Sequence, residues 1–280
     1  MSGFSIDWLN LREDADRRAR SGELRQQALD WLGLAAPAAA FGMSAAPQPG
    51  EVIVTDLGSG TGATLRALSA PGSQQLVWRL VDHDGALLDE ALRRHRRDYR
   101  IEDHQNDLAI VAELPLGGAR LVTASALFDL VSAALVDRLV QRLAGLRAGW
   151  PNGLYAALNY DGSTDWDPPH PYDAAVLAAF NRDQRRDKGL GRALGPDSGA
   201  YLQQALDTAG YAVMTAASPW QLDGRDASLV RQLIDGIVSA VGSDPSIEPG
   251  QLQDWREFRL AHASTGRCCL GHLDVLALPR

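Results

Sequence analysis

The residues most suited to chemistry begin with three glycines at alternate positions, Gly58, Gly60 and Gly62. They stand in the run Asp56-Leu-Gly-Ser-Gly-Thr-Gly, which follows the apolar, β-branched residues 52–55. Glycine lets a backbone turn sharply and lets a ligand lie directly against it. A continuous apolar run predicts a buried strand, and the residues after the glycines predict a helix. A strand, a glycine turn and a helix in this order are typical of a cofactor site.

A second candidate group is the carboxylate of Asp82, which ends the next predicted strand. It stands some 24 residues beyond Gly58, near the spacing at which an acidic residue binds the ribose of a dinucleotide. A carboxylate there can accept hydrogen bonds from both hydroxyls of an unphosphorylated ribose. Asp84 precedes the next predicted helix and is expected to cap it. His83 would lie beside the ribose or the adenine.

Together these residues resemble class I S-adenosylmethionine-dependent methyltransferases, over about residues 50–160. The pattern DxGxGxG from Asp56 to Gly62 is similar to the first motif of that family, and Val81-Asp82 followed by Leu87-Leu88 is similar to the second. The resemblance implies S-adenosylmethionine as the cofactor, with its methionine part against the glycine loop. The cofactor-binding residues that it implies are Asp56, Gly58, Ser59, Gly60, Asp82, His83, Asp107, Leu108, Ala124 and Ser125.

Two further segments match the family less fully. Asp107 stands where the family has an aspartate that binds the adenine amino group, although the preceding residues 99–104 are polar for a strand. Residues 120–129 resemble the strand that leads to the reaction centre. They follow Ala119, so the acidic residue common at the start of that strand is absent.

The methyl acceptor is expected at the carboxyl end of a further predicted strand, residues 154–158, and in the loop after it. Methyl transfer is an in-line displacement, so positioning contributes much of the catalysis and a general base is optional. Variable N-terminal helices often close the site in this family, so the resemblance also implies a lid there. The predicted catalytic residues are Tyr160, Asp161 and His170, and the predicted substrate-binding residues are Asn159, Trp8 and Arg12.

Two alternative functions stay open. The dinucleotide fingerprint GxGxxG is partly met, because Ala63 stands at its last position and alanine occurs there. A nicotinamide-dependent oxidoreductase is therefore possible, and a non-catalytic protein that keeps the cofactor fold is the other alternative. No metal is expected. The acidic residues at 161–167 lack the turn glycine and the closing glutamate of a calcium loop.

Strands that alternate with helices must position these groups. They predict an α/β fold, a Rossmann-like doubly wound sheet that is mostly parallel and has helices on both faces. The resemblance implies one antiparallel strand, for which residues 268–278 are the natural candidate. Residues 1–48 are predicted as a helical cap and linker, and residues 49–280 as the cofactor-binding domain. An insertion at 161–196 is predicted as a loop that holds one helix. The other predicted strands cover 76–81, 121–124 and 211–216, and the other helices 85–97, 130–143, 197–209, 229–241 and 251–262.

Composition restricts the partners. The chain has 280 residues, with 35 acidic and 27 basic side chains and a net charge of -8, which disfavours nucleic acid as a partner. The hydrophobic share of 45% and charged share of 22% are those of a globular protein. The N-terminus has no apolar run of signal-peptide length, and the most apolar later stretch, residues 32–46, falls short of a membrane span. The adjacent Cys268 and Cys269 suit a reducing compartment. We expect a soluble, cytoplasmic protein with a small-molecule substrate, and leave its oligomeric state open.

Overall fold

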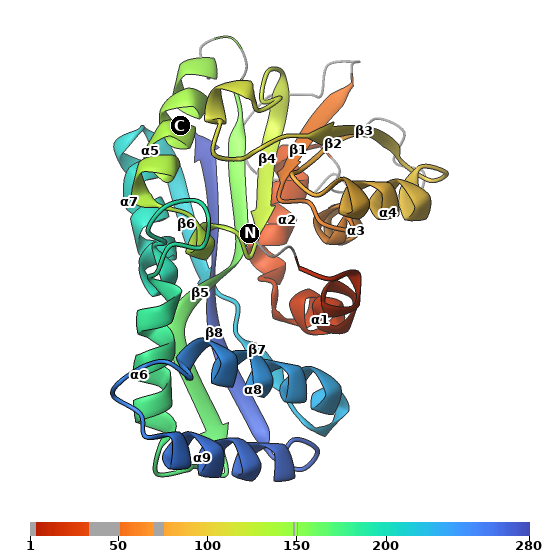
Figure 1. The fold of residues 1–280 in the computed structure, drawn as a ribbon. Coiled ribbons are helices and arrows are strands. Elements are labelled where there is room, and N and C mark those ends of the chain that lie inside the picture. Colours follow the sequence, from red (N-terminus) through yellow and green to blue (C-terminus); the bar gives the residue numbers. More distant parts are fainter. Residues whose placement is uncertain (1–3, 34–50, 70–75, 148, 150) are drawn as a thin grey trace.

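The computed structural model describes residues 4–33, 51–69, 76–147, 149 and 151–280. Within these residues, eight strands form one sheet (Figure 1). The strands are β1 (Val52–Leu57), β2 (Leu76–Asp82), β3 (Arg100–Gln105), β4 (Ala119–Ser125), β5 (Gly153–Asp167), β6 (Tyr211–Ala217), β7 (Trp220–Leu222) and β8 (Arg267–Pro279). Their order is β3-β2-β1-β4-β5-β8-β6, and β7 pairs with β8.

The directions of the strands confirm the predicted fold class. Neighbouring strands from β3 to β5 run parallel, whereas β8 runs antiparallel to both β5 and β6. The C-terminal strand is thus the antiparallel one, and it lies inside the sheet between β5 and β6. β3 lies at one edge of the sheet, and four of its six residues are exposed. Solvent on that side explains why its sequence is polar.

Helices cover both faces of the sheet, and the predicted helices are confirmed to within a few residues at their ends. Buried residues of α5 and α7 pack with β4 and β5 on one face, while α2, α3 and α4 pack with β1 and β2 on the other. The helices are α1 (Ile6–Ala19), α2 (Gly22–Trp31), α3 (Ala63–Leu68), α4 (Gly85–His95), α5 (Ala133–Leu146), α6 (Asp173–Gln184), α7 (Ser198–Thr208), α8 (Ala227–Val241) and α9 (Pro249–Ala261).

The insertion predicted as a loop from residue 161 begins instead as a strand. β5 continues to Asp167, and its outer part pairs with the first residues of β8, from Asp167 opposite Arg267 to Thr164 opposite Leu270. Exposure alternates along residues 161–167. One face of this ribbon meets solvent, so its sequence is too polar to predict a buried strand. The ribbon, β7 and helices α6, α8 and α9 form an extension with its own apolar core (Figure 1).

The helical cap predicted at the N-terminus consists of two helices, α1 and α2. Leu24 and Ala28 of α2 are buried against the sheet. α1 packs instead against β7 and α8 of the extension. The predicted linker at 35–50 lies outside the described residues. Among the helices of the described segments, none has the length and apolar character that a bilayer crossing requires.

A buried carboxylate joins the N-terminal helices to the sheet. Asp274 of β8 is fully buried, and its Oδ1 accepts a hydrogen bond from the backbone N–H of Leu158 (2.8 Å). Its Oδ2 accepts hydrogen bonds from the hydroxyl of Tyr155 (2.9 Å) and from the backbone N–H of Ser21 (3.0 Å). Leu158 has a left-handed φ of 59° at an irregularity in the register of β5 against β8. Asp274 therefore fixes the backbone of β5 where the strand passes from the main sheet into the extension.

Candidate functional site

A cavity of about 120 Å³ opens at the carboxyl ends of β1, β2 and β4. This is the edge at which open α/β sheets bind ligands. The glycine loop after β1 forms its floor, and Asp82 and Ser125 contribute from the ends of β2 and β4. Leu9, Arg12 and Asp16 of α1 also line the cavity. Their spacing puts them on one face of that helix, so α1 forms a wall of the cavity.

The glycine loop needs its glycines. Gly58, Gly60 and Gly62 have φ values of 64°, 53° and 84°, a region that L side chains rarely adopt. A Cβ atom at Gly60 would lie 3.1 Å from Cδ1 of Leu9, and one at Gly58 would lie 3.4 Å from Cδ1 of Leu127. The bare backbone of the loop therefore serves both its conformation and its close contact with α1.

Asp82 lies on the cavity wall with spare hydrogen-bonding capacity. Its side chain is buried, and Oδ2 accepts from the backbone N–H of Gly60 (2.9 Å) while Oδ1 accepts from that of Asp84 (3.1 Å). His83 also lines the cavity, with Nδ1 3.2 Å from Oδ1 of Asp82. A carboxylate has about four lone-pair sites, so Asp82 can accept further bonds from a ligand. Asp84 caps α4 as predicted, because its Oδ1 accepts from the N–H of Ala86 (2.9 Å).

Asp56 lies beneath the glycine loop and does not line the cavity. It is 1% exposed; its Oδ1 accepts a hydrogen bond from the hydroxyl of Thr123 (2.7 Å), and its Oδ2 has no partner among the described residues. Burial raises the pKa of Asp56 to about 7, because a carboxylate is disfavoured where water is excluded. Its position suits support of the loop more than contact with a ligand.

The other predicted cofactor residues divide between the cavity and its surroundings. Ser59, Leu108 and Ser125 line the cavity. Ala124 is buried one residue before the cavity wall. Asp107 is exposed and outside the lining, and its Oδ1 accepts a hydrogen bond from the N–H of residue 109 (2.8 Å). At this turn Leu108 faces the cavity, and Asp107 stabilises the turn.

The residues predicted to act at the end of β5 do not line the cavity. Asn159 donates hydrogen bonds from Nδ2 to the carbonyls of Ala156 (3.1 Å) and Leu273 (2.8 Å). The hydroxyl of Tyr160 donates to Oδ1 of Asn181 (2.8 Å). Burial raises the pKa of Tyr160 well above its usual range, so the tyrosinate form is disfavoured at neutral pH.

Asp161 and His170 belong to the extension. The carboxylate of Asp161 is exposed and accepts from the backbone N–H (2.9 Å) and the hydroxyl (2.7 Å) of Ser163. The ring of His170 packs against Phe258, with 4.8 Å between ring centroids. The prediction treated residue 158 as the end of a strand. Because β5 continues, residues 159–161 lie within a ribbon and not at the ligand-binding edge.

Of the two predicted substrate residues on α1, Arg12 lines the cavity and Trp8 does not. The guanidinium of Arg12 donates to Asp16 through Nε (2.8 Å) and Nη2 (3.1 Å). Asp16 also accepts from Nε1 of Trp220 on β7 (2.9 Å). Trp8 is partly buried and packs against the apolar core of the extension.

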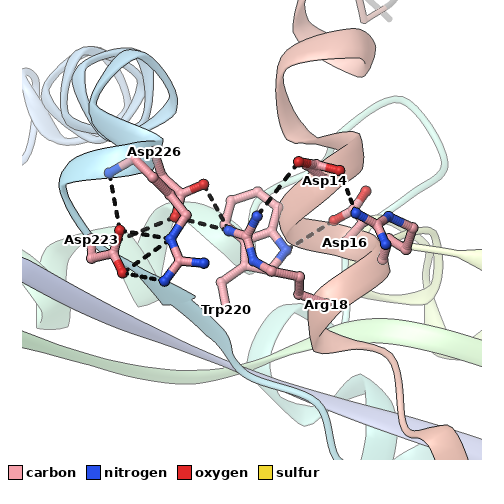
Figure 2. Close-up of polar contacts among 8 residues, drawn as sticks. Asp14, Asp16, Arg18, Trp220, Asp223 and Asp226 are labelled. Atoms are coloured by element: carbon pink, nitrogen blue, oxygen red, sulfur yellow. Dashed lines mark hydrogen bonds and ion pairs between the residues drawn. The ribbon is translucent and has the colours of Figure 1, made fainter.

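Ion pairs fix α1 between the cofactor loop and the extension. Figure 2 shows Arg18 of α1 donating to both carboxylate oxygens of Asp226 at the start of α8, at 2.7 and 2.8 Å. Towards the loop, Glu13 forms an ion pair with Arg66 of α3, which also donates to the carbonyl of Thr61 (2.7 Å). α1 thus contacts both parts of the molecule from one short helix.

Most of the apolar cavity wall is not predicted by any motif in the sequence. Phe4 and Leu9 line it from the N-terminal segment, Leu127 and Leu130 from the turn after β4, and Leu190 from the loop after α6. No motif marks these positions, because single apolar residues in turns have no periodicity. They lie far apart in the sequence, and only the packing of α1 and of the turn after β4 brings them together.

The sheet order differs from that of a dinucleotide-binding fold. A dinucleotide-binding Rossmann sheet has the order 3-2-1-4-5-6. Here an antiparallel strand lies between β5 and β6. This is the fold of class I S-adenosylmethionine-dependent methyltransferases.

Solved structures match this fold, although neither a family model nor a curated protein matches the chain. The cyclopropane synthase MmaA2 of Mycobacterium tuberculosis has a TM-score of 0.50 at 11% identity, over 98% of this chain and 94% of that one. The magnesium protoporphyrin IX methyltransferase of Synechocystis PCC 6803, with bound SAH, has a TM-score of 0.45 at 15% identity, over 78% and 83%.

A third match is phosphoethanolamine N-methyltransferase 2 of Haemonchus contortus, in complex with phosphomonomethylethanolamine and S-adenosylhomocysteine. Its TM-score is 0.42 at 12% identity, over 93% of this chain. The chain spans about half of that protein, 53% of its length.

Proposed function

We propose that this chain is a cytoplasmic S-adenosylmethionine-dependent methyltransferase that acts on a small molecule. The observation that carries the proposal is the buried carboxylate of Asp82 on the cavity wall, bonded to the backbone of a glycine loop with left-handed φ values. The carboxylate supplies hydrogen-bond acceptors for the ribose hydroxyls, and the glycine loop supplies a bare backbone surface for the rest of the cofactor.

The residues present fit this cofactor. Asp82 would accept hydrogen bonds from the ribose hydroxyls, and Leu87 and Leu108 offer an apolar surface next to it. The hydroxyl of Ser59, which is buried and unpartnered among the described residues, lies in the glycine loop and can bind a polar group of the methionine part. The cofactor, when bound, supplies a methyl group on a sulfonium sulfur. The chain orients it and excludes water, so positioning is the main contribution of these residues.

The acceptor would be small and largely apolar. Leu127, Leu130 and Leu190 line the cavity near the polar pair Arg12 and Asp16. The net charge of -8 supports a small molecule over nucleic acid. Arg12 therefore keeps its predicted role towards the acceptor. The roles predicted for Asn159, Tyr160, Asp161 and His170, and for Trp8, have no place in the proposal, since these residues do not line the cavity.

Calorimetry with S-adenosylhomocysteine tests the proposal. The wild-type chain is expected to bind it, and Asp82→Asn to bind it at least about 100-fold more weakly, because the amide offers one acceptor oxygen in place of two. Asp103→Asn, on the exposed face of β3, is the matched control and should bind like the wild type. Thermal unfolding of each variant checks the fold.

Two results would contradict the proposal. Absence of binding by the wild-type chain removes the cofactor assignment, and a spectroscopic titration that shows NADH binding would favour an oxidoreductase. Incubation with methyl-labelled S-adenosylmethionine and a metabolite extract, followed by mass spectrometry, tests transfer itself. Binding without any transfer would support a non-catalytic protein.

A further inference from the structure

The cavity wall contains a guanidinium that uses only one of its two hydrogen-bonding edges. Arg12 and Asp16 line the cavity from α1, and both side chains are largely buried. Nε and Nη2 of Arg12 donate to the two carboxylate oxygens of Asp16, at 2.8 and 3.1 Å. The second edge of a guanidinium is formed by Nη1 and Nη2. Within the described residues Nη1 has no acceptor, and it is not buried.

The plane of this guanidinium is held in place before any ligand binds. Asp16 fixes it through two hydrogen bonds, and Asp16 itself accepts from Nε1 of Trp220 at 2.9 Å (Figure 2). The indole of Trp220 also packs against the guanidinium, with Cζ of Arg12 5.1 Å from the ring centroid. A side chain that is already ordered loses little freedom on binding, so the free edge of Arg12 is preorganised for a ligand.

The pair lies away from the part of the cavity that suits a ribose. In the sheet, Asp82 at the end of β2 and Trp220 on β7 lie on opposite sides of β1 and β4. Along α1, Leu9 lies against the glycine loop, whereas Arg12 reaches Trp220. A ligand group at the free edge of Arg12 therefore belongs to the acceptor side of the cavity.

The positive charge of Arg12 is felt beyond its partner. His272 of β8 packs against Trp220, with 5.3 Å between the ring centroids. Burial is the main cause that lowers the pKa of His272 to about 4, and the charge of Arg12 adds more to this than the charge of Asp16 opposes it. A group outside the pair thus senses the guanidinium more strongly than the carboxylate, which favours an anion as the ligand of the free edge.

Resting on the proposed function, we infer that Arg12 is a specificity-determining residue that binds a carboxylate of the methyl acceptor, and that the acceptor is a small acid with an apolar body. Two parallel N–H groups on one edge match the two oxygens of a carboxylate. A phosphate carries more charge and a third oxygen, and usually needs several cations. Among the described residues that line the cavity, Arg12 is the only arginine or lysine. The leucines nearby suit the apolar body.

Calorimetry with small carboxylates tests the inference. The probes are benzoate and hexanoate at pH 7, with and without saturating S-adenosylhomocysteine, and benzamide and hexanamide are their uncharged counterparts. The wild-type chain is expected to bind each carboxylate at least about tenfold more tightly than its amide, because the amide loses the charge and one of the two acceptor oxygens. A wild type that binds carboxylates no more tightly than amides, or that binds neither, overturns the inference.

Variants of Arg12 should remove this preference. Arg12→Gln is expected to bind each carboxylate and its amide within about threefold of each other, since glutamine has no charge. Arg12→Lys keeps the charge and loses the planar fork, so it should keep part of the preference. Arg17→Gln is the matched control, because Arg17 is an exposed arginine of the same helix that pairs with Asp14. It should bind all four probes like the wild type.

A double variant separates binding from folding. Arg12→Gln leaves the carboxylate of Asp16 without its charged partner, which weakens the fold. Arg12→Gln combined with Asp16→Asn removes both charges, and the asparagine oxygen can still accept from Nε1 of Trp220. Thermal unfolding checks that this variant folds, and it should show no preference for carboxylates. A folded double variant that still prefers carboxylates would overturn the inference.

The proposed cofactor also has a carboxylate, and a second comparison distinguishes the two sources. Methylthioadenosine keeps the adenosine and the thioether of S-adenosylhomocysteine and lacks the amino acid part. If Arg12 binds the acceptor, Arg12→Gln should change the affinities for these two ligands by the same factor, to within about threefold. A variant that loses affinity for S-adenosylhomocysteine alone would assign Arg12 to the cofactor and overturn the inference.

The outcomes separate the inference from the proposed function. If the wild type does not bind S-adenosylhomocysteine, the proposed function fails, and carboxylate binding that depends on Arg12 in the cofactor-free chain would still support an acid-binding cavity. If the wild type binds S-adenosylhomocysteine and shows no preference for carboxylates, the inference fails alone.

Discussion

At the scale of single residues, the chain buries titratable groups whose pKa values shift in opposite directions. Burial raises the pKa of Asp56 to about 7 and that of Asp129 to about 6. Burial, with the charge of Arg12 nearby, lowers the pKa of His272 to about 4. The two carboxyls weaken the fold as the pH rises, and the histidine weakens it as the pH falls below 6.5. These contributions offset one another near pH 4 to 6.5, so single variants are needed to see each.

Asp56→Asn should reveal one contribution. The pKa of Asp56 is about 7 in the folded chain and 3.8 ordinarily, so folding favours the protonated carboxyl. Its contribution to the free energy of unfolding is therefore full below pH 3.8 and is lost as the pH rises through 7. The amide never ionises. The free energy of unfolding of Asp56→Asn, relative to that of the wild type, is expected to rise by up to about 4 kcal/mol between pH 4 and pH 8.

Urea unfolding at several pH values measures this difference. Asp89→Asn, an exposed aspartate on α4, is the control and should track the wild type at every pH. A constant difference between Asp56→Asn and the wild type would mean that Asp56 ionises as easily in the folded chain as in the unfolded one.

At the scale of elements, α1 does more than cover the cavity. Its face with Leu9, Arg12 and Asp16 lines the site, while Arg18 reaches the extension (Figure 2). The carboxylate of Asp226 is 8% exposed and that of Asp14, paired with Arg17 on the same helix, is 72% exposed. An ion pair with a buried partner contributes more than one in water. The two pairs therefore offer a direct comparison.

Arg18→Ala is expected to cost about 1–2 kcal/mol of unfolding free energy, because it leaves a largely buried carboxylate unpaired. It should also weaken S-adenosylhomocysteine binding and speed proteolysis within α1, since the helix loses its hold on the extension. Arg17→Ala is the matched control and should cost less than about 0.5 kcal/mol. Equal effects of the two variants in urea unfolding would argue against a docking role for Arg18.

At the scale of the whole molecule, Asp274 connects parts that are distant in sequence. One fully buried carboxylate accepts hydrogen bonds from the start of α2, from the hydroxyl of Tyr155 and from the backbone at the bend of β5. The extension begins at that bend of β5, and the start of α2 is bonded to the sheet at the same place. The position of the cavity wall therefore depends on a residue that does not line the cavity.

Asp274→Asn is expected to destabilise the chain by about 3 kcal/mol or more, because an amide nitrogen cannot accept from a backbone N–H and leaves a buried donor unpaired. Tyr155→Phe removes a single hydrogen bond and keeps the ring, so it should cost about 1–2 kcal/mol. Asp254→Asn, on the exposed face of α9, is the control. If Tyr155→Phe lowered the free energy of unfolding in urea more than Asp274→Asn does, this role of Asp274 would be contradicted.

Much of the fold could be predicted because its signals are local. The strand, glycine turn and helix from residue 52 to 68 are neighbours in the chain, and so are Asp82 and the helix that Asp84 caps. Periodicity found the helices because each buries one face. The polar edge strand β3 and the ribbon at 161–167 are harder to predict from the sequence. Solvent on one side removes the continuous apolar run that marks a buried strand.

The sequence by itself determined the cofactor side of the site, since Gly58, Gly60 and Asp82 need only a parallel sheet to come together. The tertiary structure alone decided the acceptor side. Whether Tyr160 lies at the cavity depends on how far β5 continues, and whether Arg12 does depends on where α1 packs. Those contacts join residues more than a hundred positions apart, as in the bond from Arg20 to Ser125. Such pairings arise from the packing of whole elements, and no spacing in the chain encodes them.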